Sequence, residues 1–296
     1  VDVIGNGTTW GNRRCFVRNT CVSALPSVTF NLSDWVEFTD AEVENAVSGT
    51  NSYLGEHEEA ITTWSGASWS NGLPERSRVV AVSSNYDVGV NGDLEACSLT
   101  VDSGITVTIP AGSYIDIEND LTVDDTGIIN INHEGSLVMV NDAGVVTLNG
   151  TGMINVEKTT TSFEQYDYTY WSSPIASTTF GTSLGTWRLD RTFRYIASNF
   201  EDLDDDELDD NDDVWAHILA TDVMTPGVGY AVMGPTTGSF PRTEGITFSG
   251  AVNNGVITPT ISLSADATDT EDDWNFVGNP YPCLLYTSPS PRDKRQ

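Results

Sequence analysis

The sequence is poor in basic residues. Its 296 residues include 13 Lys and Arg against 43 Asp and Glu, which gives a formal net charge of -30 at pH 7. Such a surface repels the phosphates of nucleic acids and the head groups of anionic lipids. The sequence also lacks any apolar run of the roughly 18 residues that a membrane-spanning helix requires. We therefore expect neither a nucleic-acid partner nor insertion into a membrane.

Histidine and cysteine are scarce, which argues against zinc and cysteine chemistry. The chain contains His57, His133, His217, Cys15, Cys21, Cys97 and Cys283. None of them stands at metal-ligand spacing, and the serine motifs Ser172-Ser173-Pro174 and Ser65-Gly66 lack the G-x-S-x-G elbow. The sequence therefore predicts no catalytic site, although its many carboxylates leave a glycosidase pair open. Cys15 and Cys21 either close a small hairpin loop in an oxidising compartment or remain two buried thiols.

Both ends of the chain are expected to be truncated. It begins at Val1 without a Met or a charged stretch leading into an apolar one, as a signal peptide would have. From about Cys283 a basic tail, CLLYTSPSPRDKRQ, abruptly replaces an acidic sequence. This tail resembles translated sequencing-adapter sequence, so residues 283–296 are excluded from the fold prediction.

A short unit repeats between Leu99 and Val156, with two apolar residues flanking one other residue before a turn rich in Gly, Asn or Asp. The central residues of the eight units are Thr100, Thr108, Asp116, Thr122, Asn130, Val138, Thr147 and Asn155. Alternation with a period of two is typical of a half-buried strand. Three units span 22 residues from Leu99 to Leu121 and 25 residues from Leu121 to Val146.

This register favours a short right-handed parallel β-helix over an antiparallel meander, which the alternation alone also permits. In such a solenoid Leu99, Leu121 and Val146 form one stack. Val107, Ile129 and Ile154 form a second, and Ile115 and Leu137 a third. Five glycines are expected at the corners, where tight turns require a positive φ. They are Gly104, Gly112, Gly127, Gly135 and Gly144.

The N-terminal part contains short expected strands between Gly and Asn turns. Its strings are TTWGNRR at 8–14, FVRN at 16–19, SDWVEF at 33–38 and SYLGEH at 52–57. They resemble the C-terminal half of the lamin-tail domain of secreted bacterial proteins, which implies a partial immunoglobulin-like β-sandwich over residues 1–58. That domain occurs beside very different partners, so it implies location and adhesion more than activity.

The remainder of the chain resembles a family of Flavobacteria-type cell-surface modules carried on proteins exported by type IX secretion. The matching strings are TWSG at 63–66, SWSNG at 68–72, ACSLTV at 96–101, YDYTYWSSP at 166–174, MTPGVGY at 224–230 and WNFVGNPYP at 274–282. The resemblance implies an extracellular structural or adhesive role. Surface polysaccharides or other cell-surface proteins are the partners it suggests.

The acidic run over residues 201–213 is the one segment whose pattern suggests site chemistry. Its carboxylates match positions 1, 3, 5, 9 and 12 of a calcium loop. These are Asp202, Asp204, Asp206, Asp210 and Asp213. Glu207 stands where a Gly is expected, and Asp213 replaces the longer Glu. The competing interpretation, which the composition favours, is a solvated acidic loop without calcium.

One hypothesis for six of the tryptophans is that they form a sugar-stacking platform. Aromatic residues beside Gly and Pro turns, however, more often pack in a core. They are Trp64, Trp69, Trp171, Trp187, Trp215 and Trp274. We interpret them as packing residues.

The sequence thus predicts an all-β chain. Residues 1–58 form the partial sandwich, 59–97 a linker leading into the solenoid, 98–160 the parallel β-helix and 161–282 a C-terminal β-sandwich-like domain. The expected function is that of a non-enzymatic, extracellular structural or adhesive module. The alternative is an accessory carbohydrate-binding region of a larger secreted hydrolase or nuclease.

Overall fold

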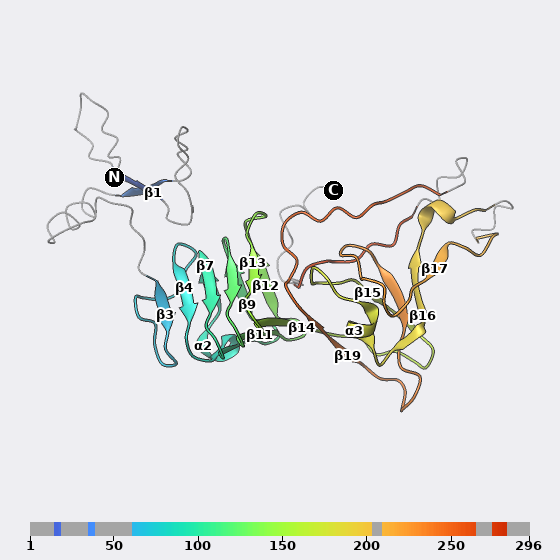
Figure 1. The fold of residues 1–296 in the computed structure, drawn as a ribbon, viewed down its shortest axis with the longest axis horizontal. Helices are drawn as coiled ribbons and strands as arrows, with labels where there is room; N and C mark the ends of the chain where they lie inside the picture. The colour runs from blue at the N-terminus through green and yellow to red at the C-terminus, as the bar shows by residue number, and fades with distance from the viewer. Residues whose placement is uncertain (1–14, 19–34, 39–60, 203–208, 265–273, 283–296) are drawn as a thin grey trace, which may run out of the picture.

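The computed structural model describes residues 15–18, 35–38, 61–202, 209–264 and 274–282. These residues form an all-β structure, as the sequence predicts (Figure 1). Before the solenoid, β1 (Cys15–Arg18) and β2 (Trp35–Phe38) pair in antiparallel fashion. Cys21 and the rest of residues 1–60 lie outside the described residues. Within the described part of the chain, no helix is long and apolar enough to cross a membrane.

A solenoid of three parallel sheets forms the first half of the described structure, and Figure 1 shows its strands stacked along the long axis of the molecule. The first sheet contains β3 (Thr62–Trp64), β4 (Val79–Val82), β7 (Ser98–Val101), β10 (Leu121–Val123) and β13 (Val146–Leu148). The second contains β5 (Tyr86–Asp87), β8 (Thr106–Ile109), β11 (Ile128–Ile131) and β14 (Met153–Thr159). The third contains β6 (Leu94–Ala96), β9 (Tyr114–Ile117) and β12 (Ser136–Met139).

The registers confirm the three predicted stacks. Leu121 pairs with Leu99 on one side and with Val146 on the other. The second stack joins Val107, Ile129 and Ile154, and the third joins Ile115 to Leu137. All eight repeat units are strands, and every pairing among them is parallel, so the antiparallel meander is wrong. Side chains alternate along a strand. The two apolar residues of each unit therefore point inward and form the core, while the central residue points outward.

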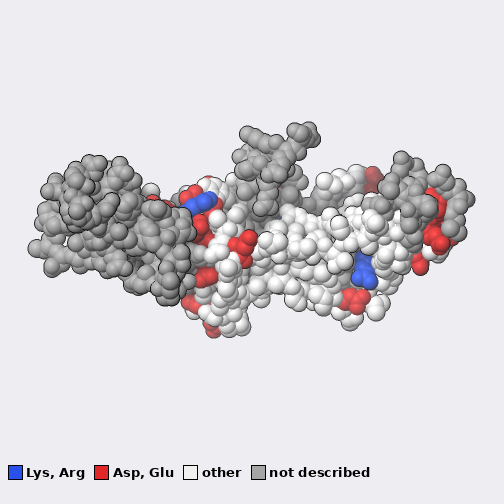
Figure 2. Space-filling model, turned by 90° about the horizontal axis from the view of Figure 1, so that it is seen from above, with Lys and Arg blue, Asp and Glu red and all other residues white. Residues whose placement is uncertain are grey.

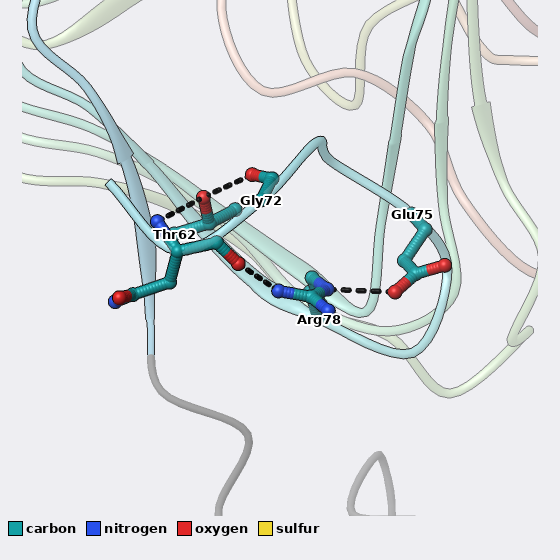
Figure 3. A network of polar contacts seen from close by, with 5 residues as sticks. Thr62, Gly72, Glu75 and Arg78 are labelled. Carbon is teal, nitrogen blue, oxygen red and sulfur yellow. Dashed lines mark hydrogen bonds and ion pairs between the residues drawn. The ribbon is translucent and has the colours of Figure 1, made fainter. Parts of the chain in front are cut away.

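The solenoid begins earlier than the repeat predicts, since β3 and β4 already pair in parallel. Its start is held by polar contacts in the segment that joins these two strands (Figure 3). The buried Thr62 donates its hydroxyl to the Gly72 carbonyl at 2.7 Å. Arg78 donates to the Asn71 carbonyl and, at 2.6 Å, to Glu75. Trp69 of this segment packs its ring against those of Trp64 and Tyr86, with centroids 5.2–5.6 Å apart.

The prediction that all five corner glycines need a positive φ is wrong for three of them. Gly104 and Gly112 do have φ values of 72° and 76°. One coil later the same places are taken by Thr126 and Glu134, with φ values of 61° and 64°.

The other three corner glycines are needed for space instead. A Cβ on Gly127, Gly135 or Gly144 would lie 2.9, 2.4 or 2.3 Å from a backbone carbonyl oxygen. The backbone N–H of each glycine donates to the carbonyl oxygen of the residue three positions earlier, and this hydrogen bond closes the turn. Close approach between backbones, a second reason for glycine at a corner, therefore decides these positions.

Side-chain amides and carboxylates fasten successive coils to one another outside the core. Asn141 donates to Asn119 and Asn155 donates to Asn130, both at 2.9 Å. Asp125 accepts from the Thr151 backbone at 2.8 Å and from its hydroxyl at 2.9 Å. These hydrogen bonds lower the pKa of Asp125. Asn and Asp residues in the turns, together with Asn130 and Asn155 in the strands, thus link successive coils.

The C-terminal region continues the solenoid without a break in the core. Strand β19 (Gly245–Ser249) pairs in antiparallel fashion with β14, and the buried Phe248 of β19 belongs to the same apolar cluster as Leu121. Asn254 donates to the carbonyls of Asn141 and Gly144 at 2.9 and 2.8 Å. The solenoid end is therefore covered by residues from the last part of the described chain.

An antiparallel sheet lies beyond this junction, at the right of Figure 1. Its order is β15 (Tyr168–Trp171), β18 (Tyr230–Met233), β16 (Arg188–Tyr195) and β17 (Trp215–His217). Two short helices, α3 (Phe180–Leu184) and the 3-10 helix η2 (Ala197–Asn199), accompany it, and α2 (Val88–Asn91) lies in the solenoid. Tyr230 and Val232 of β18 are buried in the shared core.

Candidate binding face

The C-terminal sheet has one face in the shared core and one face rich in aromatic residues. Paired residues of neighbouring strands share a face, so the register assigns the second face directly. Tyr170 and Phe193 both pair with Ala231, and Phe193 also pairs with His217. One step along the strands, Tyr168 pairs with Met233 and Tyr195 pairs with Trp215. We call this surface, together with Phe276 and Trp274, the aromatic face.

The rings of the aromatic face form two chains of contacts. In the first, Tyr168 lies 6.2 Å from Phe193, and Phe193 lies 5.7 Å from His217. The second runs from Tyr170 through Phe276, Trp215 and Tyr195 to Trp274, with centroid distances of 5.3, 6.0, 5.2 and 3.8 Å. Such contacts fix the ring orientations and contribute about 0.5–1.5 kcal/mol per pair.

Several of these rings remain accessible. Tyr168, Trp215 and Trp274 are 38–46% exposed, and Tyr170 is 69% exposed. Phe193 and Phe276 are half-buried and support them. The exposed members all carry a polar group on an otherwise apolar ring, which is the composition of surfaces that bind ligands with both apolar and polar sides.

A groove of about 830 Å³ opens beside β15. Tyr168, Tyr170 and Phe276 line both the groove and the aromatic face. Its other lining residues are rich in hydroxyl and amide groups: Thr159, Thr160, Thr161, Ser162, Tyr166, Asn279 and Tyr281. The volume lies within the range of ordinary ligand sites.

Two basic side chains line the groove, and each makes a contact with the backbone. Lys158 donates to the Pro282 carbonyl at 2.9 Å, and His133 accepts the Thr159 N–H on Nδ1 at 3.1 Å. An accepting Nδ1 places the proton of the neutral imidazole on Nε2, which makes Nε2 a donor. The groove thus offers donors and acceptors along one side and aromatic rings along the other.

Two arginines near the aromatic face are paired with neighbouring carboxylates. Arg188 forms two hydrogen bonds with Asp190, at 2.7 and 2.6 Å, and they lower the pKa of Asp190 to about 2. Arg242, on the segment beside the groove, pairs with Glu244. Figure 2 shows acidic side chains gathered over the solenoid and at the opposite end, with a largely uncharged surface between them. The molecule therefore offers an anionic ligand little attraction.

The packing interpretation of the tryptophans holds for four of the six. Trp64 and Trp187 are buried, and Trp69 and Trp171 are half-buried against the core. Trp215 and Trp274 are 40% and 46% exposed, so for them the interpretation is incomplete. The aromatic face was missed although alternation signals it: Tyr168 and Tyr170, Phe193 and Tyr195, and Trp215 and His217 are each two residues apart.

The predicted calcium residues are only partly described, because Asp204 and Asp206 lie outside the described residues. Asp202 is buried, whereas Asp210 and Asp213 are exposed. Among the described residues, no group of three or more His, Cys, Asp or Glu side chains converges as metal ligands would.

A residue outside the predicted calcium set closes the acidic loop. Asp209 accepts the backbone N–H of Glu201 at 3.2 Å and that of Val214 at 3.1 Å, one on each carboxylate oxygen. It therefore ties the start of the segment to its end, a role that its position among many acidic neighbours does not signal.

Calcium binding by this loop remains a prediction that melting measurements can test. At about 10 mM calcium, a site with a dissociation constant of about 10⁻⁴ to 10⁻³ M stabilises the fold by roughly 1 to 3 kcal/mol. We expect calcium to raise the melting temperature more than sodium does at equal ionic strength. Asp204→Asn with Asp206→Asn should remove the difference, whereas Glu118→Gln with Asp142→Asn, the same charge change on the solenoid, should not. Equal melting in both salts supports the solvated-loop interpretation.

Comparison with known proteins assigns the chain to a family without a known function. Residues 58–288 match the family described as a domain of unknown function, DUF8693. The chain belongs to the DUF8693 family. The DUF8693 match covers the solenoid, the junction and the aromatic face together. No curated protein matches the chain, and no solved structure does.

Proposed function

We propose that this chain is a non-enzymatic, extracellular structural and adhesive module of a bacterial cell-surface protein. The solenoid acts as a spacer, and the aromatic face at its end is the adhesive surface. The observation that carries the proposal is the shared core: the apolar cluster that contains Leu121 also contains Val232 beneath the aromatic face. A rigid connection between the solenoid and the C-terminal sheet is what a spacer needs in order to hold a binding surface in a fixed position.

Two further features support an extracellular location. Cys97 is disulfide-bonded, and disulfides persist mainly in oxidising compartments. The charge of -30 suits a protein surrounded by salt and divalent cations. Both features agree with the resemblance to type IX secretion substrates, which carries the bacterial cell-surface part of the proposal.

Adhesion of coated beads tests the function. Beads carrying the full chain should be retained on at least one of three surfaces: an insoluble neutral polysaccharide, an acidic polysaccharide gel or a bacterial cell layer. Beads carrying an inert acidic protein serve as the control. No reducing ends should be released from the polysaccharides during the assay. Loss of retention on all three surfaces, or hydrolysis of a polysaccharide, contradicts the proposal.

The second candidate is an accessory carbohydrate-binding region of a larger secreted hydrolase or nuclease, which the aromatic face also favours. The complete gene separates the two candidates. A catalytic domain in the same polypeptide supports the accessory role, whereas tandem β-modules alone support the structural and adhesive role.

A further inference from the structure

The aromatic face and the adjoining groove are continuous. Tyr168, Tyr170 and Phe276 belong to both, and the second chain of rings leads from Tyr170 across to Trp215 and Trp274. From β15 to β17 the sheet spans three strand spacings, or about 14 Å. An elongated ligand that enters the groove therefore meets exposed rings along a line across the sheet.

The side chains along this line select for a particular ligand chemistry. Exposed Tyr and Trp rings present faces with negative electrostatic potential, which attract the weakly positive C–H bonds of a pyranose ring. The same residues have O–H and N–H groups at their edges, and the groove adds the hydroxyls of Thr160 and Ser162. Sugars match this arrangement because they carry apolar C–H faces and hydroxyl edges.

The charge of the protein further restricts the chemical class of the ligand. The net charge of -30 repels polyanions, and two arginines near the face, Arg188 and Arg242, are paired with Asp190 and Glu244. Lys158 of the groove is a further cation and donates to the Pro282 carbonyl. One lysine in the groove offers a carboxylate or sulfate little net attraction against this excess of negative charge, so an acidic polysaccharide gains little from this surface. A glycan without charge pays no such electrostatic penalty.

We infer that the aromatic face binds an uncharged glycan chain, which lies across the sheet from the groove beside β15 to Trp215 and Trp274. This inference rests on the proposed adhesive function and names its ligand class. Tyr170 and Trp215 provide stacking surfaces for two sugar rings that lie apart along the glycan chain. The half-buried Phe276 lies between them and holds both in place.

Tryptophan fluorescence and affinity electrophoresis with soluble polysaccharides test the inference. The neutral probes are hydroxyethylcellulose, xyloglucan, mannan and laminarin, and the anionic probes are alginate and polygalacturonate. At least one neutral probe should retard the full chain and change its fluorescence, and neither anionic probe should do so. Tyr170→Ala and Trp215→Ala should each weaken binding about 10-fold.

Matched variants distinguish the loss of ring stacking on the ligand from a loss of protein stability. Tyr170→Phe keeps the ring and should bind within about 3-fold of the parent chain, which corresponds to less than 1 kcal/mol. Leu73→Ala removes an apolar side chain on the solenoid that is 76% exposed and should have no effect. Tyr170→Phe and Leu73→Ala should melt at the temperature of the parent chain. Tyr170→Ala and Trp215→Ala remove one and two ring contacts, each worth about 0.5–1.5 kcal/mol, so they should melt at a lower temperature but stay folded at the temperature of the binding assay.

The outcomes distinguish this inference from the proposed function. Binding of a neutral probe that survives both alanine substitutions overturns the assigned site. Binding of the anionic probes alone, or of none, overturns the glycan class. If beads then still adhere to cells and lose adhesion in the Tyr170→Ala and Trp215→Ala variants, the adhesive function stands with a protein partner. If the beads adhere to nothing, the proposed function fails too.

Discussion

Replacing Leu121 by Ala is expected to lower the free energy of unfolding by about 2 to 5 kcal/mol. Leu121 is fully buried and pairs with Leu99 and Val146 in the coils on either side. The substitution removes apolar contacts in the middle of a stack and leaves a cavity. Neighbouring coils are held by their own backbone ladders, which limits how far they can collapse into it.

Urea unfolding followed by circular dichroism measures this loss. Leu73→Ala is the matched control, because it makes the same side-chain change at a residue that is 76% exposed. The control should change the free energy of unfolding by less than about 0.5 kcal/mol. A similar small effect for both variants would show that Leu121 does not lie inside a packed stack.

Gly135→Ala is expected to destabilise the solenoid by about 1 to 3 kcal/mol or more, although Gly135 does not have a positive φ. The added Cβ would lie 2.4 Å from the Ile109 carbonyl oxygen of the preceding coil. Ile109 belongs to a strand ladder, so its backbone cannot move without disturbing the pairing of β8 with β11. The coils must separate locally to admit one methyl group.

Gly245→Ala controls for the general effect of glycine replacement. Its Cβ would meet atoms no closer than 3.7 Å, and Gly245 also has no positive φ. We expect no loss of stability, or a gain of up to about 1 kcal/mol from reduced freedom of the unfolded chain. Thermal unfolding of the two variants side by side gives the comparison. Equal stability of Gly135→Ala and the parent chain would contradict the close approach of the coils.

The solenoid between Leu99 and Val156 could be predicted because every strand of every coil needs apolar residues at its inward positions. Inward positions such as Val107, Ile129 and Ile154 recur at nearly constant spacing, and a parallel stack needs little else. The earlier coils could not be found in this way. Val80 stands only 19 residues before its partner Leu99, and a helix, α2, replaces a plain turn between β5 and β6.

The aromatic face was harder to predict because it depends on which strands become neighbours. Tyr170 and Trp215 are 45 positions apart in the sequence and come from the two edge strands of the sheet. Alternation assigns each residue a face within its own strand, but only the order of the sheet brings the faces together. Trp274 and Phe276 join them from a segment outside the sheet, which no local pattern indicates.

The proposed function depends on one structural claim, that the solenoid and the C-terminal sheet share a single core. Hydrogen exchange on the Leu121→Ala variant tests it most directly. If the core is continuous, the amides of β18 beneath the aromatic face and those of β11 lose protection together. The free energy of opening then falls by the same amount in both strands. Unchanged protection in β18 while β11 loses its own would contradict a shared core and would separate the spacer from its binding face.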